Sequence, residues 1–411
     1  MEYRKLQNGS DVRGVAMEGI EGQPVNLTEE AVENIAKAFV LYLQEKFNKS
    51  ELKLSIGRDS RLSGERLLAA AAKGVLAMGT DLADFGLAST PSMFMSTVTK
   101  GYEYDGAIML TASHLPWNRN GMKFFTRDGG LEKSEIASIL ARAQENAFIP
   151  TAERGNLTKI DFLSVYAAGL VETIRSSVNA EDYEHPLKGF HIVVDTGNGA
   201  GGFFAERVLQ PLGADTTGSQ FLEPDGHFPN HAPNPEDETA MESVTKCVLE
   251  NKADMGVIFD TDVDRAGAVA ADGKEINRNR LIALIAAVLL EEHPGTTIVT
   301  DSITSSGLAV FIAAQGGVHH RFKRGYKNVI DEAIRINQSG RDCQLAIETS
   351  GHGALKENYF LDDGAFLITK LLIKMAQLKK EGRTLFSLID SLAEPAESTE
   401  VRMNLSCADC Q

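Results

Sequence analysis

A serine stands where an open α/β sheet usually presents a reactive group. Ser113 lies in the polar segment TASHLP, residues 111–116, directly after the apolar run AIML, residues 107–110. An apolar run that ends in small and polar residues predicts a buried strand followed by an exposed turn, and ligands bind at such strand ends. The pattern makes Ser113 a candidate nucleophile, and His114 could order its loop.

A cluster of carboxylates forms a second candidate site. Three aspartates stand at alternate positions directly after the apolar run MGVIF, residues 255–259: Asp260, Asp262 and Asp264. If the chain curls as it leaves the strand, their oxygens can converge on one Mg²⁺ ion, which commonly takes a few carboxylates together with phosphate oxygens. A phosphate on Ser113 could supply the remaining ligand. The alternative is a solvated acidic turn, in which these carboxylates would repel one another unless something neutralised them.

Polar and basic residues elsewhere suit an anionic, hydroxylated ligand. Glu348 and Ser350 follow the apolar run LAI, residues 345–347, and offer an acceptor and a donor for adjacent hydroxyls. Two side chains could transfer protons: Lys123 and His352. Three basic side chains could hold phosphate: Arg13, Arg265 and Lys327. Each of these residues alone is more often a surface charge or a satisfied polar group, so their combination is what indicates phosphoryl transfer.

A glycine-rich turn has two interpretations. Gly197, Gly199 and Gly202 match GxGxxG between an apolar run and a helix-like segment, with an acidic residue, Asp215, farther along. By pattern alone this is a dinucleotide site. Glycines are equally needed where a tight strand-to-helix turn packs closely, and a short motif in mid-chain favours this structural interpretation.

Composition restricts the class of protein. The chain has 411 residues, which predicts two to four domains, and its formal net charge is -16. This charge argues against nucleic acid or an anionic membrane as a partner. The longest apolar run, residues 281–290, is too short for a membrane span, and the charged start is unlike a secretory signal. We expect a cytoplasmic protein, although an organellar protein whose transit peptide has been removed would look the same.

Strands and helices that alternate along the chain would position these residues. Apolar spacing predicts helices over residues 28–43, 63–78, 132–146 and 203–212. Short apolar runs predict strands over residues 52–56, 81–85, 190–194, 255–259 and 297–300. The alternation predicts an α/β fold with mixed or parallel sheets, with breaks near Pro150 and near the turn at residues 272–274.

Four ordered motifs resemble those of the α-D-phosphohexomutases, the phosphoglucomutase and phosphomannomutase group. They are TASHLP at 111–116, NGMK at 120–123, DTDVDR at 260–265 and ETSGH at 348–352. The resemblance extends to about Glu394 and implies three consecutive similar α/β domains with mixed sheets. The implied domains are a catalytic phosphoserine domain at 1–155, a metal-binding domain at 156–274 and a sugar-binding domain at 275–394.

The resemblance also implies the roles of single residues. Ser113 would be the phosphoserine beside His114, and its phosphate would share Mg²⁺ with Asp260, Asp262 and Asp264. Sugar contacts would come from Glu348, Ser350 and Gly351. The phosphate-handling and proton-transfer positions would be Arg13, Lys123, Arg265, Gly325, Lys327 and His352. Leu115 and Trp117 depart from the common pattern and indicate a subgroup, and Arg324 stands before Gly325 where many members carry valine.

A member of this group would interconvert hexose 1-phosphate and hexose 6-phosphate. A phosphoserine would transfer its phosphate to the free hydroxyl, and the resulting 1,6-bisphosphate would turn over and return its other phosphate to Ser113. Glucose 1,6-bisphosphate would thus be intermediate and activator. Glucose and mannose differ only at C2, so a loop that grips O3 and O4 cannot choose between them. We expect a monomer or homodimer without nucleic-acid or membrane partners.

Two other classes of function fit parts of the pattern. A phosphatase of the haloacid dehalogenase type would use Asp260 as nucleophile and Asp262 as general acid, which leaves Ser113 without a role. A mutase relative could also bind sugar phosphates without turning them over. In addition, residues 395–411 look like the start of a fourth, phosphate-binding domain that is absent or truncated, which would impair turnover.

Overall fold

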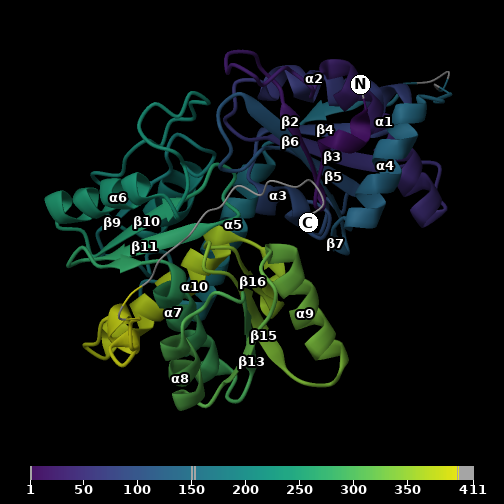
Figure 1. Ribbon diagram of the computed structural model, residues 1–411. Coiled ribbons are helices and arrows are strands. Elements are labelled where there is room, and N and C mark those ends of the chain that lie inside the picture. Colours follow the sequence, from purple (N-terminus) through teal and green to yellow (C-terminus); the bar gives the residue numbers. More distant parts are fainter. Residues whose placement is uncertain (1, 150, 152–153, 396, 398–411) are drawn as a thin grey trace.

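The computed structural model of the protein describes residues 2–149, 151, 154–395 and 397. Three α/β units follow one another along the chain, each built on its own sheet (Figure 1). In Figure 1 the first unit lies at the upper right, the second at the left and the third below them. The predicted α/β architecture with three similar domains and mixed sheets is confirmed.

The first unit contains a mixed sheet with the strand order β1-β2-β6-β5-β3-β4-β8, and β7 pairs with β6. Its strands are β1 (Gln7–Asn8), β2 (Asp11–Val15), β3 (Lys53–Arg58), β4 (Asp81–Leu87), β5 (Gly106–Leu110), β6 (Arg119–Thr126), β7 (Gly129–Gly130) and β8 (Leu157–Lys159). Its helices are α1 (Glu29–Phe47), α2 (Gly64–Ala77), α3 (Thr90–Met95) and α4 (Lys133–Glu145). Strands β5, β3, β4 and β8 run parallel, so their carboxyl ends share one edge of the sheet.

Strand β5, which leads into the Ser113 turn, is buried on both faces. Ile108 and Leu110 pack in the core that α1, α2 and α4 cover, whereas Ala107 and Met109 pack on the opposite side against α3. A strand with two buried faces reads as a continuous apolar run rather than an alternating one. This explains why the segment before Ser113 has no polar residue.

The predicted helix at residue 28 begins as its sequence indicates. The Thr28 side chain accepts a hydrogen bond from the Ala31 backbone N–H, and Glu29 and Glu30 lie in the first turn, where they complement the helix dipole. The predicted helix at residue 63 also forms, but Ser63 does not cap it. Its hydroxyl accepts a hydrogen bond from Asn120 instead, which ties α2 to strand β6.

The second unit contains a four-stranded sheet with the order β12-β11-β10-β9, in which only β9 and β10 are parallel. Its strands are β9 (Ile192–Asp195), β10 (Met255–Phe259), β11 (Ala266–Ala270) and β12 (Glu275–Ile276), and its helices are α5 (Phe162–Val178) and α6 (Glu238–Asn251). The helix predicted over 203–212 is instead a π-helical segment at Phe204–Leu209 followed by a 3₁₀ turn at Gln210–Leu212. Pro211 in that turn cannot donate the hydrogen bond that a continuing helix needs.

The third unit contains a five-stranded sheet with the order β14-β13-β15-β16-β17. Its strands are β13 (Thr297–Thr300), β14 (Val318–Arg321), β15 (Cys343–Ile347), β16 (Gly353–Leu355) and β17 (Leu361–Asp362). Its helices are α7 (Arg278–Glu292), α8 (Ser306–Ala314), α9 (Tyr326–Gln338) and α10 (Gly364–Lys380). Strands β14, β13 and β15 are parallel, so the loop with Glu348 leaves the carboxyl end of a parallel strand.

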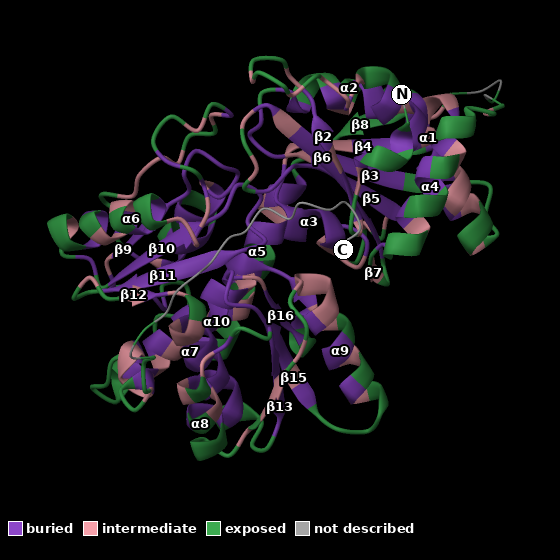
Figure 2. Cartoon of the chain, viewed as in Figure 1, coloured by how far each residue is buried: buried purple, intermediate pink, exposed green. Residues whose placement is uncertain are grey.

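One apolar core joins the three units. It includes Phe85 of β4, Phe259 of β10 and Leu345 of β15, and Figure 2 shows α7 and α10 largely buried within it. The apolar run 281–290 is the buried centre of α7, and among the described residues no helix is long and apolar enough to cross a membrane. The three units therefore pack against one another around this shared apolar core.

The sheets extend slightly beyond the boundaries expected from the sequence. Strand β8 pairs with β4, so the first sheet continues past residue 155, and β12 pairs with β11 past residue 274. The expected turn at 272–274 is therefore a hairpin inside the second unit. The expectation for residues 395–411 falls almost wholly outside the described residues.

Candidate active site

Ser113 lies in a strained turn at the carboxyl end of β5. The serine is buried, and its φ of 51° is in the left-handed region. This conformation is unfavourable for any residue that has a Cβ atom. Its backbone N–H donates to the Thr111 hydroxyl at 2.9 Å, which helps to hold this turn. Strained residues of this kind concentrate at functional sites.

The aspartate loop connects β10 to β11 and brings its three carboxylates together. Ligand oxygens of Asp260, Asp262 and Asp264 lie within 4.8 Å of one another, and all three residues are buried. Val263, between Asp262 and Asp264, has a φ of 66°, so the chain curls as it leaves β10. Burial and the adjacent Asp264 carboxylate raise the pKa of Asp260 well above its usual range.

These carboxylates fit a divalent cation. The Oδ1 atoms of Asp262 and Asp264 are buried and accept no hydrogen bond from any described residue. A buried carboxylate oxygen without a partner is costly, and an ion bound there would remove that cost. Mg²⁺ prefers ligand sets made only of oxygen, so the donor set is appropriate for it.

The serine and the aspartate loop meet across the interface between the first two units. The Ser113 hydroxyl donates to Asp260 Oδ2 at 3.0 Å, and Arg265 Nη2 donates to the Ser113 oxygen at 3.1 Å. The same Nη2 lies 2.8 Å from His114 Nδ1. Burial, followed by Arg265 and Arg13, lowers the pKa of His114 to about 3, so its ring is neutral and can accept this bond.

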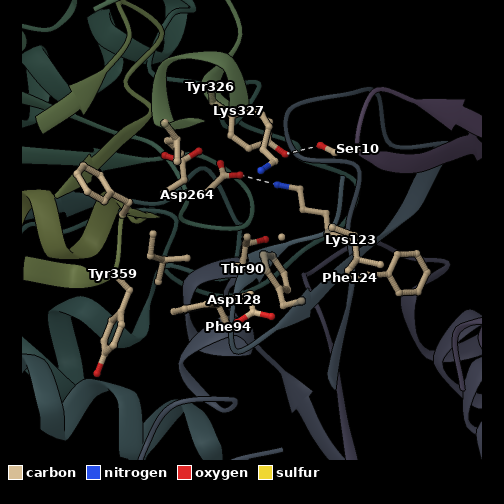
Figure 3. Close-up of a pocket in the computed structure, with 18 of the residues that line it drawn as sticks. Ser10, Thr90, Phe94, Lys123, Phe124, Asp128, Asp264, Tyr326, Lys327 and Tyr359 are labelled. Atoms are coloured by element: carbon tan, nitrogen blue, oxygen red, sulfur yellow. Dashed lines mark hydrogen bonds and ion pairs between the residues drawn. The ribbon is translucent and has the colours of Figure 1, made fainter. Parts of the chain in front are cut away.

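Lys123 of β6 reaches the aspartate loop from the first unit (Figure 3). Its ammonium donates to Asp264 Oδ2 at 2.5 Å and to Asp262 Oδ2 at 3.2 Å. Burial opposes the charge, yet these two carboxylates raise the pKa of Lys123 well above its usual value. Thr90, at the start of α3, donates its hydroxyl to Asp262 Oδ2 at 2.5 Å. Two groups of the first unit therefore fix the geometry of the loop.

His352 is the last residue of the ETSGH loop in the third unit and lies among carboxylates. Its Nδ1 contacts Asp362 Oδ2 and lies 4.0 Å from Asp264 Oδ1. Although burial lowers it, these carboxylates raise the pKa of His352 to about 9. The ring stacks on Tyr326 with centroids 5.1 Å apart, and the Tyr326 hydroxyl lies 3.1 Å from Ser10 Oγ. The third unit thereby presents a protonated imidazole toward the aspartates.

Glu348 and Ser350 lie together on the loop after β15. Glu348 Oε1 accepts from the Gly325 backbone N–H at 2.6 Å, and Ser350 Oγ lies 3.4 Å from Glu348 Oε2. Burial raises the pKa of Glu348. Gly351 has a φ of 93°, and a Cβ atom there would lie 2.7 Å from the Ala266 carbonyl oxygen, so only glycine fits this turn.

The two remaining predicted residues differ in their surroundings. Arg13 Nη2 donates to Asp11 Oδ2 at 2.9 Å, and the guanidinium is nearly buried beside the aspartate loop. Lys327 lies in the first turn of α9, but its ammonium pairs with Glu132 at 2.5 Å and Asp331 at 2.8 Å. Lys327 and Lys123 line the same cavity, which has a volume of about 80 Å³. The Lys327 ammonium contacts Glu132 and Asp331 instead of the aspartate loop.

Sequence reasoning missed four residues that shape the site. They are Asp11, Thr90, Tyr326 and Asp362. Asp362 precedes Asp363, which caps α10 by accepting from Phe366 N–H, so the pair reads as an ordinary acidic helix start. Thr90 likewise begins a short helix whose cap, Ser89, is a conventional one. Only the fold reveals that these side chains point at the aspartate loop or at its partners.

The glycine-rich turn after β9 meets packing requirements. A Cβ atom on Gly199 would lie 2.8 Å from the Thr261 carbonyl oxygen, and one on Gly202 would lie 2.5 Å from that of Leu222. Gly197 has a φ of 50°. These close approaches support the structural interpretation of the motif, because glycine is needed there whether or not a ligand binds.

Comparison with known proteins gives consistent matches along the chain. The family models for phosphoglucomutase/phosphomannomutase alpha/beta/alpha domains I, II and III match residues 4–149, 166–273 and 277–395. A phosphomannomutase/phosphoglucomutase of Pseudomonas putida is 31% identical over 363 residues, which cover 88% of this chain and 73% of that protein. A phosphomannomutase of Escherichia coli is 32% identical over 339 residues, which cover 80% of this chain and 71% of that protein.

The fold comparison agrees. A crystal structure of a phosphoglucomutase/phosphomannomutase family protein from Burkholderia thailandensis matches with a TM-score of 0.79 and 28% identity, covering 96% of this chain and 81% of that chain. A putative phosphomannomutase from Thermus thermophilus shares the fold with a TM-score of 0.75 at 21% identity, covering 94% of this chain and 83% of that chain. Because the three domain models match in order and cover most of the chain, the chain belongs to the phosphoglucomutase/phosphomannomutase family of enzymes, as its four motifs predicted.

Proposed function

We propose that the chain interconverts hexose 1-phosphate and hexose 6-phosphate, of glucose, mannose or both, through a phosphoserine at Ser113 and a hexose 1,6-bisphosphate. The observation that carries this proposal is the contact of Ser113 with both Asp260 and Arg265, at 3.0 and 3.1 Å. A nucleophile between a carboxylate cluster and a guanidinium suits phosphoryl transfer, in which positioning and charge stabilisation supply most of the catalysis.

Mg²⁺ would bind to three carboxylates and to the phosphate on Ser113. The ligands would be Asp260, Asp262 and Asp264. A bound Mg²⁺ would stabilise the negative charge of the phosphoryl group as it is transferred. The hydrogen bond from Ser113 to Asp260 describes the unphosphorylated serine, and Lys123 neutralises part of the cluster in that state.

Arg265 and the two protonated groups would handle charge and protons at the phosphate. The Arg265 guanidinium stands at the Ser113 oxygen, where it would stabilise the serine oxyanion as the phosphoryl group leaves. Lys123 of the first unit and His352 of the third unit both face the Asp264 carboxylate. We assign them the roles of general acid and base, and the nearer-neutral pKa of His352 makes it the easier of the two to deprotonate.

The third unit would hold the sugar. Glu348 and Ser350 would bind two adjacent hydroxyls, O3 and O4, with Gly351 letting the backbone approach the ring. Glucose and mannose are identical at these positions, so the loop would accept either. Arg13 and Lys327 would be available to hold phosphate, and Gly325 would let the backbone approach it. The three units would thus supply phosphoserine, metal site and sugar site in chain order.

The bisphosphate would turn over inside the site. Its second phosphate would return to Ser113, so one serine serves both half-reactions and glucose 1,6-bisphosphate also rephosphorylates a serine that has lost its phosphate. The phosphatase alternative places the nucleophile on Asp260 instead. Asp260 Oδ2 already accepts from Ser113 and from Arg265, which favours Asp260 as a partner of the serine.

Mapping the phosphorylated residue tests this assignment. The protein is incubated with glucose 1,6-bisphosphate, and intact mass and phosphopeptides are then measured with and without hydroxylamine, which cleaves acyl phosphates. We expect one phosphate on Ser113 that survives hydroxylamine. A phosphate that is lost with hydroxylamine and maps to Asp260 would replace the mutase proposal with the phosphatase.

A further inference from the structure

Arg61 is a buried cation that the proposed reaction does not use. It lies between β3 and α2, and its side chain is 0% exposed. The guanidinium donates to four backbone carbonyl oxygens, three in the loop that contains Ser113 and one at the first residue of β6. The acceptors are the carbonyls of Ser113 itself, Leu115 at 2.5 Å, Pro116 at 2.8 Å and Arg119 at 2.9 Å.

The charge of Arg61 is balanced by Asp59. Its Nε lies 3.3 Å from Asp59 Oδ2, and its backbone N–H donates to Asp59 Oδ1 at 3.0 Å. The face of the guanidinium lies over the Phe228 ring of the second unit, 5.4 Å from the centroid. Arg61 therefore contacts the end of β3, the serine loop and the second unit at once.

The geometry requires arginine rather than any cation. A guanidinium has five N–H donors in a rigid plane, whereas a lysine ammonium has three donors on a flexible stem and cannot span four carbonyls. The carbonyls converge because the loop folds around the cation, and this loop includes the left-handed turn at Ser113. Without the cation, four carbonyl dipoles would point at one another in a buried space, and the loop would relax away from this shape.

We propose that Arg61 is the positioning residue of Ser113, which holds the serine loop in the strained conformation that aims its oxygen at the aspartate loop. The proposal rests on the assignment of Ser113 as the phosphoserine, but it adds a residue whose side chain acts through backbone carbonyls rather than through the metal-binding carboxylates. A displaced reacting atom costs rate rather than substrate affinity, and a shift of about 1 Å can cost about a hundredfold. Loss of Arg61 should therefore act on kcat.

The test uses the full chain and two variants. Arg61→Lys keeps the positive charge that pairs with Asp59 but removes the planar guanidinium and its N–H donors. The double variant Arg61→Gln, Asp59→Asn leaves no unpaired buried charge, so it remains informative if the lysine variant fails to fold. The matched control is Arg142→Lys, because Arg142 also forms a bidentate contact, at 2.8 Å to Glu45, but on the surface of α4.

Four quantities are measured for each variant that folds: kcat, KM for glucose 1-phosphate, the midpoint of a Mg²⁺ titration followed by calorimetry, and the rate of phosphate transfer from phosphorylated protein to glucose 1-phosphate. We expect kcat and the transfer rate to fall about a hundredfold. KM and the Mg²⁺ midpoint should stay within about threefold of the wild type, and Arg142→Lys should change none of the four.

Two results would overturn the proposal. One is a kcat within about threefold of the wild type in either Arg61 variant. The other is a parallel loss of kcat, substrate affinity and Mg²⁺ affinity, because general destabilisation would move all three whereas positioning moves only the first. A wild-type protein that accepts no phosphate on Ser113 would instead refute the proposed function, so the two failures are distinguishable.

Discussion

The Lys123 ammonium lies 2.5 Å from Asp264 Oδ2, and the two side chains come from different units of the fold. One cation of the first unit therefore neutralises part of a carboxylate cluster that belongs to the second. The same ammonium also contacts Asp262 at 3.2 Å. In our account these carboxylates serve two cations, the permanent lysine and Mg²⁺, and the balance between them determines metal affinity and proton transfer.

Replacing Lys123 with methionine should separate these two effects. Removal of a competing positive charge should strengthen Mg²⁺ binding, while loss of a proton-transfer group should reduce kcat by about 10²- to 10⁴-fold. Calorimetric Mg²⁺ titration and steady-state kinetics measure the two quantities independently. Lys73→Met on the exposed face of α2 is the control. Weaker Mg²⁺ binding in Lys123→Met would show that the lysine organises the metal site instead of competing with it.

Asp262→Asn should weaken Mg²⁺ binding, because it removes one negative charge from the cluster and replaces a carboxylate whose Oδ1 accepts no hydrogen bond from the described residues. Loss of a residue that only hydrogen-bonds to a metal ligand lowers metal affinity about 10- to 100-fold. Loss of a ligand itself should lower the Mg²⁺ affinity by at least this much. Titration of the variant with Mg²⁺ gives the value directly, without an activity assay. Asp272→Asn, in the exposed hairpin turn, should leave the affinity unchanged. An unaltered titration for Asp262→Asn would mean that the metal binds elsewhere.

Asp362→Asn should shift the alkaline limb of the pH profile. Although burial opposes it, the Asp362 and Asp264 carboxylates raise the pKa of His352 to about 9, so the imidazole stays protonated at neutral pH. If this cation is required, kcat/KM of the wild type falls as the pH rises through about 9. Without the Asp362 charge the fall should begin at lower pH, toward the ordinary value near 6.5.

The profile of kcat/KM between pH 5 and about 10 checks this, a range that brackets the titration of histidine in proteins. Asp342→Asn, which breaks an exposed pair with Lys356 in the same unit, is the matched control. Identical alkaline limbs in the wild type and in Asp362→Asn would assign the limb to another group.

Gly199→Ala should disturb the metal loop through packing. The added Cβ atom would lie 2.8 Å from the Thr261 carbonyl oxygen, and Thr261 lies between two of the aspartates. Overpacking of this kind costs about 1–3 kcal/mol, so the melting temperature should fall and Mg²⁺ binding should weaken. Gly169→Ala in α5, where a Cβ atom meets nothing within 4 Å, should do neither. A variant that instead loses affinity for NADH would revive the dinucleotide interpretation.

Much of the architecture could be predicted from apolar spacing. Strands β10 and β13 have the predicted bounds, 255–259 and 297–300, and α1 begins after its predicted cap, Thr28. Local patterns succeed here because each strand is short, apolar and bounded by turn residues. The family also followed from the sequence. Three of its four motifs follow the ends of β5, β10 and β15, and the fourth, NGMK, lies within β6.

The residues whose roles could not be predicted from the sequence depend on contacts between distant segments. Arg61 looks like a surface residue before a helix, and only the path of the serine loop makes it the centre of four carbonyls. Asp362 reads as part of a helix start until the fold sets it against His352. The π-helical segment after β9 also departs from its helical pattern. For Arg61 and Asp362 tertiary packing decides the role, whereas the π-helical segment ends where Pro211 cannot continue a helix.

The most direct test of the central claim is a single-turnover transfer from Ser113. Protein labelled with radioactive phosphate on Ser113 is mixed with glucose 1-phosphate and Mg²⁺, and the products are separated over time, with Ser113→Ala as the control. We predict that the label leaves the protein for glucose 1,6-bisphosphate before it appears in glucose 6-phosphate, and that Ser113→Ala takes up no label and loses turnover by several orders of magnitude. Release of the label only as inorganic phosphate, or near-normal turnover by Ser113→Ala, would contradict the account.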